Sequence, residues 1–327
     1  MKLVVPINNY QEIDRLIEEG ADDFYFGYLD KEWLLKYSCF SGNRRENFHA
    51  NFTEINDVYN ATQKIHSAGM KIAVTMNDRY TESQYDSLKP VVDKIVDAGV
   101  DAFIIADLGL LLKFKEWNIK AGIHISTGGG VFNQQTALFF QDFNVERIIL
   151  PRQLSLSEIK CIAECSNTSF EIFGIFGRDP YIDAFCRFHH GINCIFPKIG
   201  PCGCIRLNEA DFRCVGTCQE QNDERQIFKP FRSLNHIQVD GCAACILPFL
   251  NIQNVNYLKI VGRGANTDRK VQGIRMLKHG LQLANKEMDI SEVVTSCKAK
   301  FNEVFSEYCV QSNCYYENIV EFLKSSG

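Results

Sequence analysis

The stretch KIAVTMNDRYTESQYDSLKPVVDKIVDAGVDAFIIADLGLLLKFKEWNIKAGIHIS, residues 71–126, decides the fold class. Short apolar runs at 71–76, 102–107 and 121–126 alternate with the segments 84–99 and 110–117, whose apolar residues recur with helical spacing. Apolar strands that alternate with helices are typical of a parallel sheet covered by helices. The stretch therefore predicts successive β/α units.

The same alternation extends in both directions along the chain. Further strands are predicted at 2–7, 23–28, 147–150, 170–176 and 257–261, and further helices at 10–20, 52–69, 134–143, 156–165 and 270–286. Thr53 is expected to cap the helix at 52–69, and a short helix is expected at 246–252. Eight units in order predict a TIM-like (β/α)8 barrel, with an open doubly wound sheet as the alternative.

The alternation of predicted strands and helices suggests how the chain is divided into domains. We expect residues 1–288 to form the barrel, including a Cys-rich insertion at 178–245 that follows the seventh strand. Residues 289–327 are expected to form a C-terminal helical extension. Because active sites of such barrels lie on the loops that follow the strands, the insertion is predicted to lie on the active-site face.

Composition narrows the class of protein. The chain has 327 residues, of which 46% are hydrophobic and 23% charged, so it can bury a full core without disulfides. The apolar run at the amino terminus is too short for a signal peptide, and no window is long enough for a membrane span, so we expect a cytoplasmic protein. The net charge of −5 argues against a globally basic nucleic-acid surface but permits a local basic groove.

The 14 cysteines are unevenly distributed, because eight of them lie between residues 186 and 245. Thiolates as close in sequence as Cys214 and Cys218, or Cys242 and Cys245, can bind one metal centre, and sulfur ligands favour zinc or an iron–sulfur cluster. The chain has one true CxxC pair, which matches a zinc ribbon less well than a [4Fe–4S] cluster. Cysteines expected instead to be packing residues are Cys161, Cys165, Cys297, Cys309 and Cys314.

Several polar residues follow or interrupt the predicted strands. Arg152 follows the sixth strand. Arg263 follows the eighth strand, and barrels often bind phosphate on the loops after strands seven and eight; the alternative is an arginine that caps a carboxylate at the barrel end. The two arginines at 44–45 could bind a carboxylate or phosphate through bidentate hydrogen bonds, or they could lie in a solvated loop. His124, in the fifth strand, is either an acid–base group at the barrel top or a core histidine. Glu171 is expected to be in the site or paired with Arg147 or Arg152.

Six stretches in chain order resemble one known family. They are residues 20–27 (GADDFYFG), 101–109 (DAFIIADLG), 123–127 (IHIST), 145–155 (VERIILPRQLS), 170–173 (FEIF) and 258–263 (LKIVGR). Together they resemble the collagenase-like peptidase U32 family. The resemblance implies a TIM-like barrel and, in the iron–sulfur members, a [4Fe–4S] cluster and oxygen-independent hydroxylation.

The resemblance also suggests metal ligands. The family pattern continues from strand seven through a glycine to a first and then a second cysteine. In this chain Asp179 stands in the first place, Cys186 matches the second, and Cys242 matches a ligand of some members. The missing cysteine leaves the full set open, and the expected ligands are four out of the following residues: Cys186, Cys214, Cys218, Cys242 and Cys245.

Three readings of function follow. In the first, the chain is an iron–sulfur oxidoreductase that hydroxylates RNA, a quinone precursor or a peptide, with His124, Arg152 and Arg263 positioning the substrate. A partner protein of the same family is a further expectation. In the second it is a peptidase, although no nucleophile–base pair is recognisable. In the third it is a non-catalytic peptide- or partner-binding protein whose loop is held by structural zinc.

Overall fold

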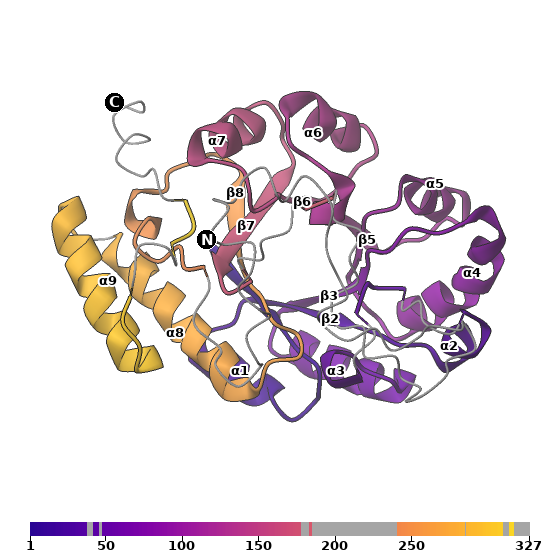
Figure 1. The fold of residues 1–327 in the computed structure, drawn as a ribbon. Helices are drawn as coiled ribbons and strands as arrows, with labels where there is room; N and C mark the ends of the chain where they lie inside the picture. The colour runs from indigo at the N-terminus through magenta and orange to yellow at the C-terminus, as the bar shows by residue number, and fades with distance from the viewer. Residues whose placement is uncertain are drawn as a thin grey trace, which may run out of the picture.

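The computed structural model describes residues 1–37, 42–45, 48–177, 183–184, 241–284, 286–309 and 314–316. Its centre is a closed barrel of eight strands in chain order, and every neighbouring pair is parallel (Figure 1). β8 closes the barrel against β1, with Lys2 opposite Tyr257 and Val4 opposite Lys259. The predicted TIM-like (β/α)8 barrel is therefore confirmed, and the open-sheet alternative is wrong.

The strands are short, apolar and buried. Their bounds are β1 Lys2–Pro6, β2 Asp23–Gly27, β3 Lys71–Met76, β4 Ala102–Ile105, β5 Gly122–Ile125, β6 Arg147–Ile149, β7 Ser169–Ile175 and β8 Val255–Ile260. Side chains on one face of each strand fill the barrel, and those on the other face pack under the helices, so most positions are buried.

Helices lie around the outside of the barrel (Figure 1). They are α1 Ile13–Glu19, α2 Lys31–Tyr37, α3 Ile55–Ser67, α4 Glu82–Asp97, α5 Leu108–Glu116, α6 Gln134–Gln141, α7 Leu156–Glu164, α8 Thr267–Leu283 and α9 Ile290–Phe305, with 3-10 turns η1 Phe48–Ala50, η2 Thr127–Gly129 and η5 Leu247–Phe249. Their ends follow local sequence rules. Asp107 caps α5, Ser155 and Glu158 form a capping box on α7, and Gly20 ends α1 at a φ of 103°.

Local differences from the sequence expectations have simple causes. α3 begins at Ile55 with Glu54 as its N-cap, so the expected cap at Thr53 is wrong by one residue. The short helix expected at 246–252 is one 3-10 turn with Pro248 near its start. α2 was not expected, because its seven residues are too few for a clear helical period and its position depends on packing against α4.

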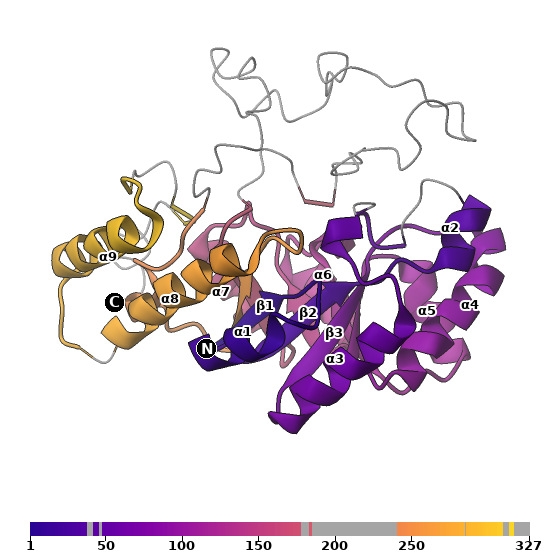
Figure 2. The ribbon, with the colours of Figure 1, turned by 90° about the horizontal axis from the view of Figure 1, so that it is seen from below.

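The C-terminal helix α9 lies alongside α8 at one side of the barrel, as Figures 1 and 2 both show. Asp289 caps α9, and its buried residues include Val293, Cys297 and Phe301. The ring of His279 on α8 is 3.0 Å from the Ser296 hydroxyl of α9. The part of the tail that the structure describes is thus packed onto the last β/α unit.

A buried ionic network crosses the barrel interior. Arg147 donates to Asp23 at 2.8 Å and to Glu171 at 3.0 Å, and Lys259 donates to Glu171 at 2.7 Å. The expected pairing of Glu171 with Arg147 is confirmed. Burial by itself raises the pKa of Glu171, but Lys259 and Arg147 outweigh it and hold that pKa below its usual range. Within the described ranges, no helix is long and apolar enough to cross a membrane.

Candidate functional site

The candidate site is centred on Arg263, which follows β8 at the carboxyl-end mouth of the barrel. Its side chain is 4% exposed. The guanidinium donates to the Thr75 hydroxyl, to Asn51 Oδ1 at 3.3 Å and to Asn43 Oδ1 at 3.2 Å. These three partners are neutral. Gly27, at the end of β2, makes the arrangement possible, because a Cβ there would overlap the Arg263 guanidinium.

The electrostatics around Arg263 favour a bound anion. Burial lowers the pKa of Arg263, and the nearby Arg45 lowers that pKa further. No carboxylate in the described part of the chain hydrogen-bonds to this guanidinium or raises its pKa. A buried cation with neutral partners is costly, and an entering anion would offset that cost.

Arg152 lies at the same mouth, after β6. Its guanidinium stacks over the Phe173 ring, 4.5 Å from the centroid, and its Nε donates to Asp183 Oδ2 at 3.0 Å. Tyr25, buried inside the barrel, is within electrostatic range of both Arg152 and Arg263. The structure therefore brings these two predicted site residues to one region, and the carboxylate of Asp183 already balances one of them.

The far side of the mouth carries Asn77 and Ser126, which follow predicted strands, and Arg79, which the sequence reading did not single out. Asn77 donates to the Ser126 hydroxyl at 3.2 Å, while its Oδ1 is buried without a partner among the described residues. Arg79 donates to the carbonyls of Ala106 and Gly128. The sequence signal was present, since Thr75, Asn77 and Arg79 continue the two-residue period of β3 past the end of the strand.

His124 lies away from this mouth. Its register partner on β6 is Arg147, the first residue of that strand, and its Nε2 is 3.9 Å from Glu146 Oε2. Burial, reinforced by Arg147, Lys259 and Lys71, lowers the pKa of His124 well below its usual value, so the ring is neutral and the contact with Glu146 is not an ion pair. An acid–base role stays a prediction. The structure does not bring His124 together with Arg152 and Arg263.

The predicted metal ligands are only partly within the described residues. Cys186, Cys214 and Cys218 lie outside them, whereas Cys242 is buried opposite Ile175 at the carboxyl end of β7. Cys245 is half-buried. Across the ranges that the structure describes, no group of three or more His, Cys, Asp or Glu side chains is arranged to hold a metal ion.

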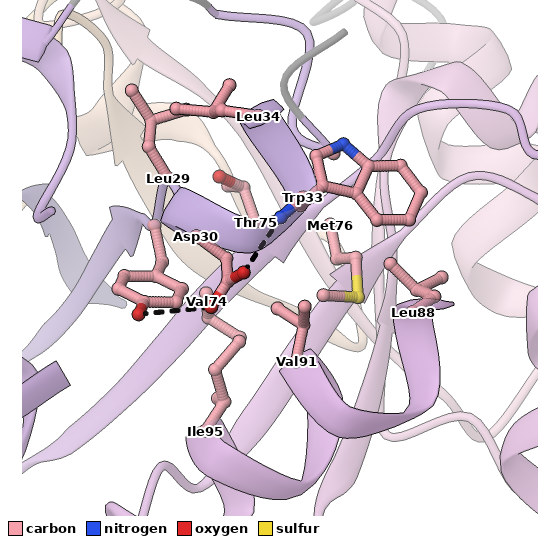
Figure 3. A pocket seen from close by; sticks show the side chains of 12 residues that line it. Leu29, Asp30, Trp33, Leu34, Val74, Thr75, Met76, Leu88, Val91 and Ile95 are labelled. Carbon is pink, nitrogen blue, oxygen red and sulfur yellow. Dashed lines mark hydrogen bonds between the residues drawn. The ribbon is translucent and has the colours of Figure 1, made fainter. Parts of the chain in front are cut away.

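A separate small pocket lies outside the barrel wall, between β3 and the helices α2 and α4 (Figure 3). Its lining is mostly apolar and includes Val74, Met76 and Val91. The carboxylate of Asp30 points toward the Trp33 backbone, from which it accepts a 3.0 Å hydrogen bond, and it also pairs with Lys94 at 3.0 Å. Since this acidic group is already paired, we place the candidate site at the mouth instead.

Comparison with known proteins identifies the family. The model of peptidase family U32 matches residues 8–321. The chain belongs to this family. This confirms the resemblance noted from the six sequence stretches.

Some curated relatives of this U32 protein are named for RNA hydroxylation, and one is named as a protease. A tRNA hydroxylation protein P of Escherichia coli is 28% identical over 53% of this chain, and the 23S rRNA 5-hydroxycytidine C2501 synthase of the same organism is 27% identical over 38%. An uncharacterized protease of Methanocaldococcus jannaschii is 29% identical over 50%. The matches cover 35%, 19% and 36% of those proteins, so this chain spans about a third or less of each.

Proposed function

We propose that this U32 chain forms the barrel of an oxygen-independent RNA hydroxylase that carries an iron–sulfur cluster. Relatives named for tRNA hydroxylation and for 5-hydroxycytidine synthesis in 23S rRNA support the RNA substrate. The single observation that carries the proposal is the buried guanidinium of Arg263, which has neutral partners at the mouth of the barrel. The net charge of −5 gives the chain no overall attraction for anionic RNA, whereas Arg263 provides a local positive charge at the mouth.

The residues at the mouth have complementary roles in this proposal. Arg263 binds a phosphate or another anionic group of the substrate, and Arg152 stabilises it from the β6 side. The Oδ1 of Asn77, which has no partner among the residues that the structure describes, accepts a hydrogen bond from an N–H of the substrate. A base that enters the barrel mouth must leave its stack, and single-stranded RNA loops offer such bases at low cost.

The cluster is part of the proposal because the expected donors are all thiolates. Cys242 fits, since it is a buried thiol beside the carboxyl end of β7 and therefore on the mouth side. The proposed ligands are four out of Cys186, Cys214, Cys218, Cys242 and Cys245. A bound cluster would supply electron transfer. The described residues do not complete the site by themselves, so no reaction step is derived through the cluster.

The test combines metal analysis with RNA analysis. Protein purified without oxygen is expected to be brown and to contain iron and sulfide in equal amounts, and the Cys242→Ser variant is expected to lose both. In cells lacking the gene, mass spectrometry of nucleosides should show the loss of one hydroxylated nucleoside, which the wild type restores and the Arg263→Gln variant does not. Colourless protein with one bound zinc and unchanged nucleosides would contradict the proposal.

The same purified protein and its cysteine variants can also test the peptidase alternative. The family name and the relative from Methanocaldococcus jannaschii carry this alternative. Cleavage of peptides that survives replacement of Cys186, Cys214, Cys218 and Cys242 would favour a protease without a cluster.

A further inference from the structure

A short loop connects two sides of the barrel mouth. Residues 42–45 lie between α2 and η1, and Asn43 Oδ1 in this loop accepts a hydrogen bond from the Arg263 guanidinium at 3.2 Å. The next side chain, Arg44, reaches the β5 side, because a Cβ added to Gly128 would lie 3.9 Å from Arg44 Nη1. Arg44 has a φ of 60°, which is uncommon for a residue with a side chain and is found more often at functional sites.

Arg79, in the loop after β3, contacts the same glycine from another direction. Its guanidinium donates to the backbone carbonyl of Gly128. The loops that carry the two arginines are also joined directly, since the Tyr80 hydroxyl donates to the Gly42 carbonyl at 2.5 Å. Arg44 and Arg79 are thus two positive charges that separate segments hold beside one backbone position.

The two arginines beside Gly128 are accessible to a ligand. Arg79 is exposed and Arg44 is half-buried. Among the described residues, the Arg79 guanidinium hydrogen-bonds to two backbone carbonyls and to no carboxylate. A guanidinium has more N–H donors than these two bonds use, so Arg79 can still donate to a ligand. Neighbouring cations repel each other, and a bound phosphate would offset that repulsion while accepting hydrogen bonds from both.

This position is distinct from that of Arg263. The Arg263 guanidinium hydrogen-bonds to Thr75 of β3. Gly128 instead donates its backbone N–H to the Ser126 hydroxyl, after β5, at 3.3 Å. Asn77 lies between the two positions, because it continues the two-residue period of Thr75 and donates to Ser126 at 3.2 Å. The mouth therefore has a cationic group on each side and hydrogen-bonding groups in the middle.

We propose that Arg44 and Arg79 bind a second phosphate of the RNA, separate from the phosphate at Arg263. This inference rests on the proposed function, which supplies the RNA strand. The phosphates on either side of one nucleotide would lie on the two sides of the mouth, and the base would face Asn77 and Ser126. The substrate is therefore an internal nucleotide of an RNA strand, because neither a free nucleoside nor a nucleoside monophosphate fills both phosphate positions.

The test is the salt dependence with which the full chain binds a labelled RNA stem-loop, measured by fluorescence anisotropy. The double variant Arg44→Gln, Arg79→Gln is expected to reduce the slope of log Kd against log salt by about 1, and adding Arg263→Gln should bring the reduction to about 2. The double variant Arg44→Lys, Arg79→Lys should keep the wild-type slope, because both charges are retained. Arg275→Gln, which changes an exposed arginine of α8, is the matched control and should leave the slope unchanged.

Three results would overturn the second phosphate position. One is a wild-type slope in the double glutamine variant. Another is a triple variant whose slope equals that of Arg263→Gln alone, because both sides would then share one phosphate. The third is a double lysine variant that loses as much slope as the glutamine variant, which would show an effect on the loops and not on charge. In each case the RNA hydroxylase proposal would stand, since it depends on Arg263. Conversely, the expected slopes together with unchanged cellular nucleosides would remove the hydroxylase and leave both phosphate positions.

Discussion

The guanidinium of Arg147 on β6 donates a 3.0 Å hydrogen bond to the carboxylate of Glu171 on β7, inside the barrel. Both side chains are nearly inaccessible to water, and the same guanidinium lies 3.4 Å from the centroid of the Tyr257 ring. Asp23 and Lys259 complete a network in which each buried charge has a partner. The interior of this barrel is thus organised by charge as well as by apolar packing.

Replacing Arg147 by Met should therefore be strongly destabilising. The substitution leaves the carboxylates of Asp23 and Glu171 buried with one cation fewer, and we expect the free energy of unfolding to fall by about 3–5 kcal/mol. Urea denaturation measures this. The matched control is Arg275→Gln, which removes an exposed pair with Glu19 and should cost at most about 1 kcal/mol. Equal costs for the two variants would contradict the network.

Arg263→Gln should weaken RNA binding without unfolding the protein. Loss of one phosphate contact is expected to lower the affinity at every salt concentration and to reduce the slope of log Kd against log salt by about 1. Fluorescence anisotropy with a labelled RNA stem-loop measures both. Arg275→Gln, on the outer face of α8, is the control and should leave the slope unchanged. A slope that Arg263→Gln leaves at the wild-type value would place the anion site elsewhere.

Gly27→Ala should reproduce the Arg263 defect while leaving the arginine in place. A Cβ at residue 27 would overlap the guanidinium and the Asn51 amide oxygen, so Arg263 must leave its position. We expect the same reduction of the salt slope by about 1. Gly264→Ala is a matched control, since its Cβ would meet Ala50 at an ordinary 3.5 Å. If Gly264→Ala weakens RNA binding as much as Gly27→Ala, the effect is not specific to the Arg263 position.

His124 should make folding stability depend on pH. Its folded pKa lies well below the ordinary value, so the unfolded chain takes up a proton that the folded protein excludes. The stability that results is present above the unfolded pKa and is lost as pH falls below it. Between about pH 7.5 and about pH 5.5 this loss is about 1.4 kcal/mol for an unfolded pKa near 6.5.

Urea unfolding of the wild type and of His124→Gln at the two pH values measures this loss. Other groups titrate in both proteins, so the difference between their pH dependences isolates His124. Parallel pH dependences would show that the histidine is accessible to protons in the folded state.

Much of the architecture could be predicted because it is encoded locally. Short apolar runs that alternate with segments of helical spacing predicted eight β/α units, and the closed barrel confirms them. Helix ends also follow neighbouring residues, such as Asp107 before α5. The buried position of Glu171 and its need for a cation could be inferred from its place in an apolar strand. Arg152 and Arg263 could be placed at the mouth because they directly follow strands.

The tertiary structure alone decided the environment of these residues. Arg263 has neutral partners because Asn43, Asn51 and Thr75 come from segments far away in sequence, and no local pattern records which residues meet there. The sequence by itself determined the order and type of the elements, since periodicity is a property of near neighbours. Burial and charge balance were decided by contacts between distant segments, which only the folded chain brings together.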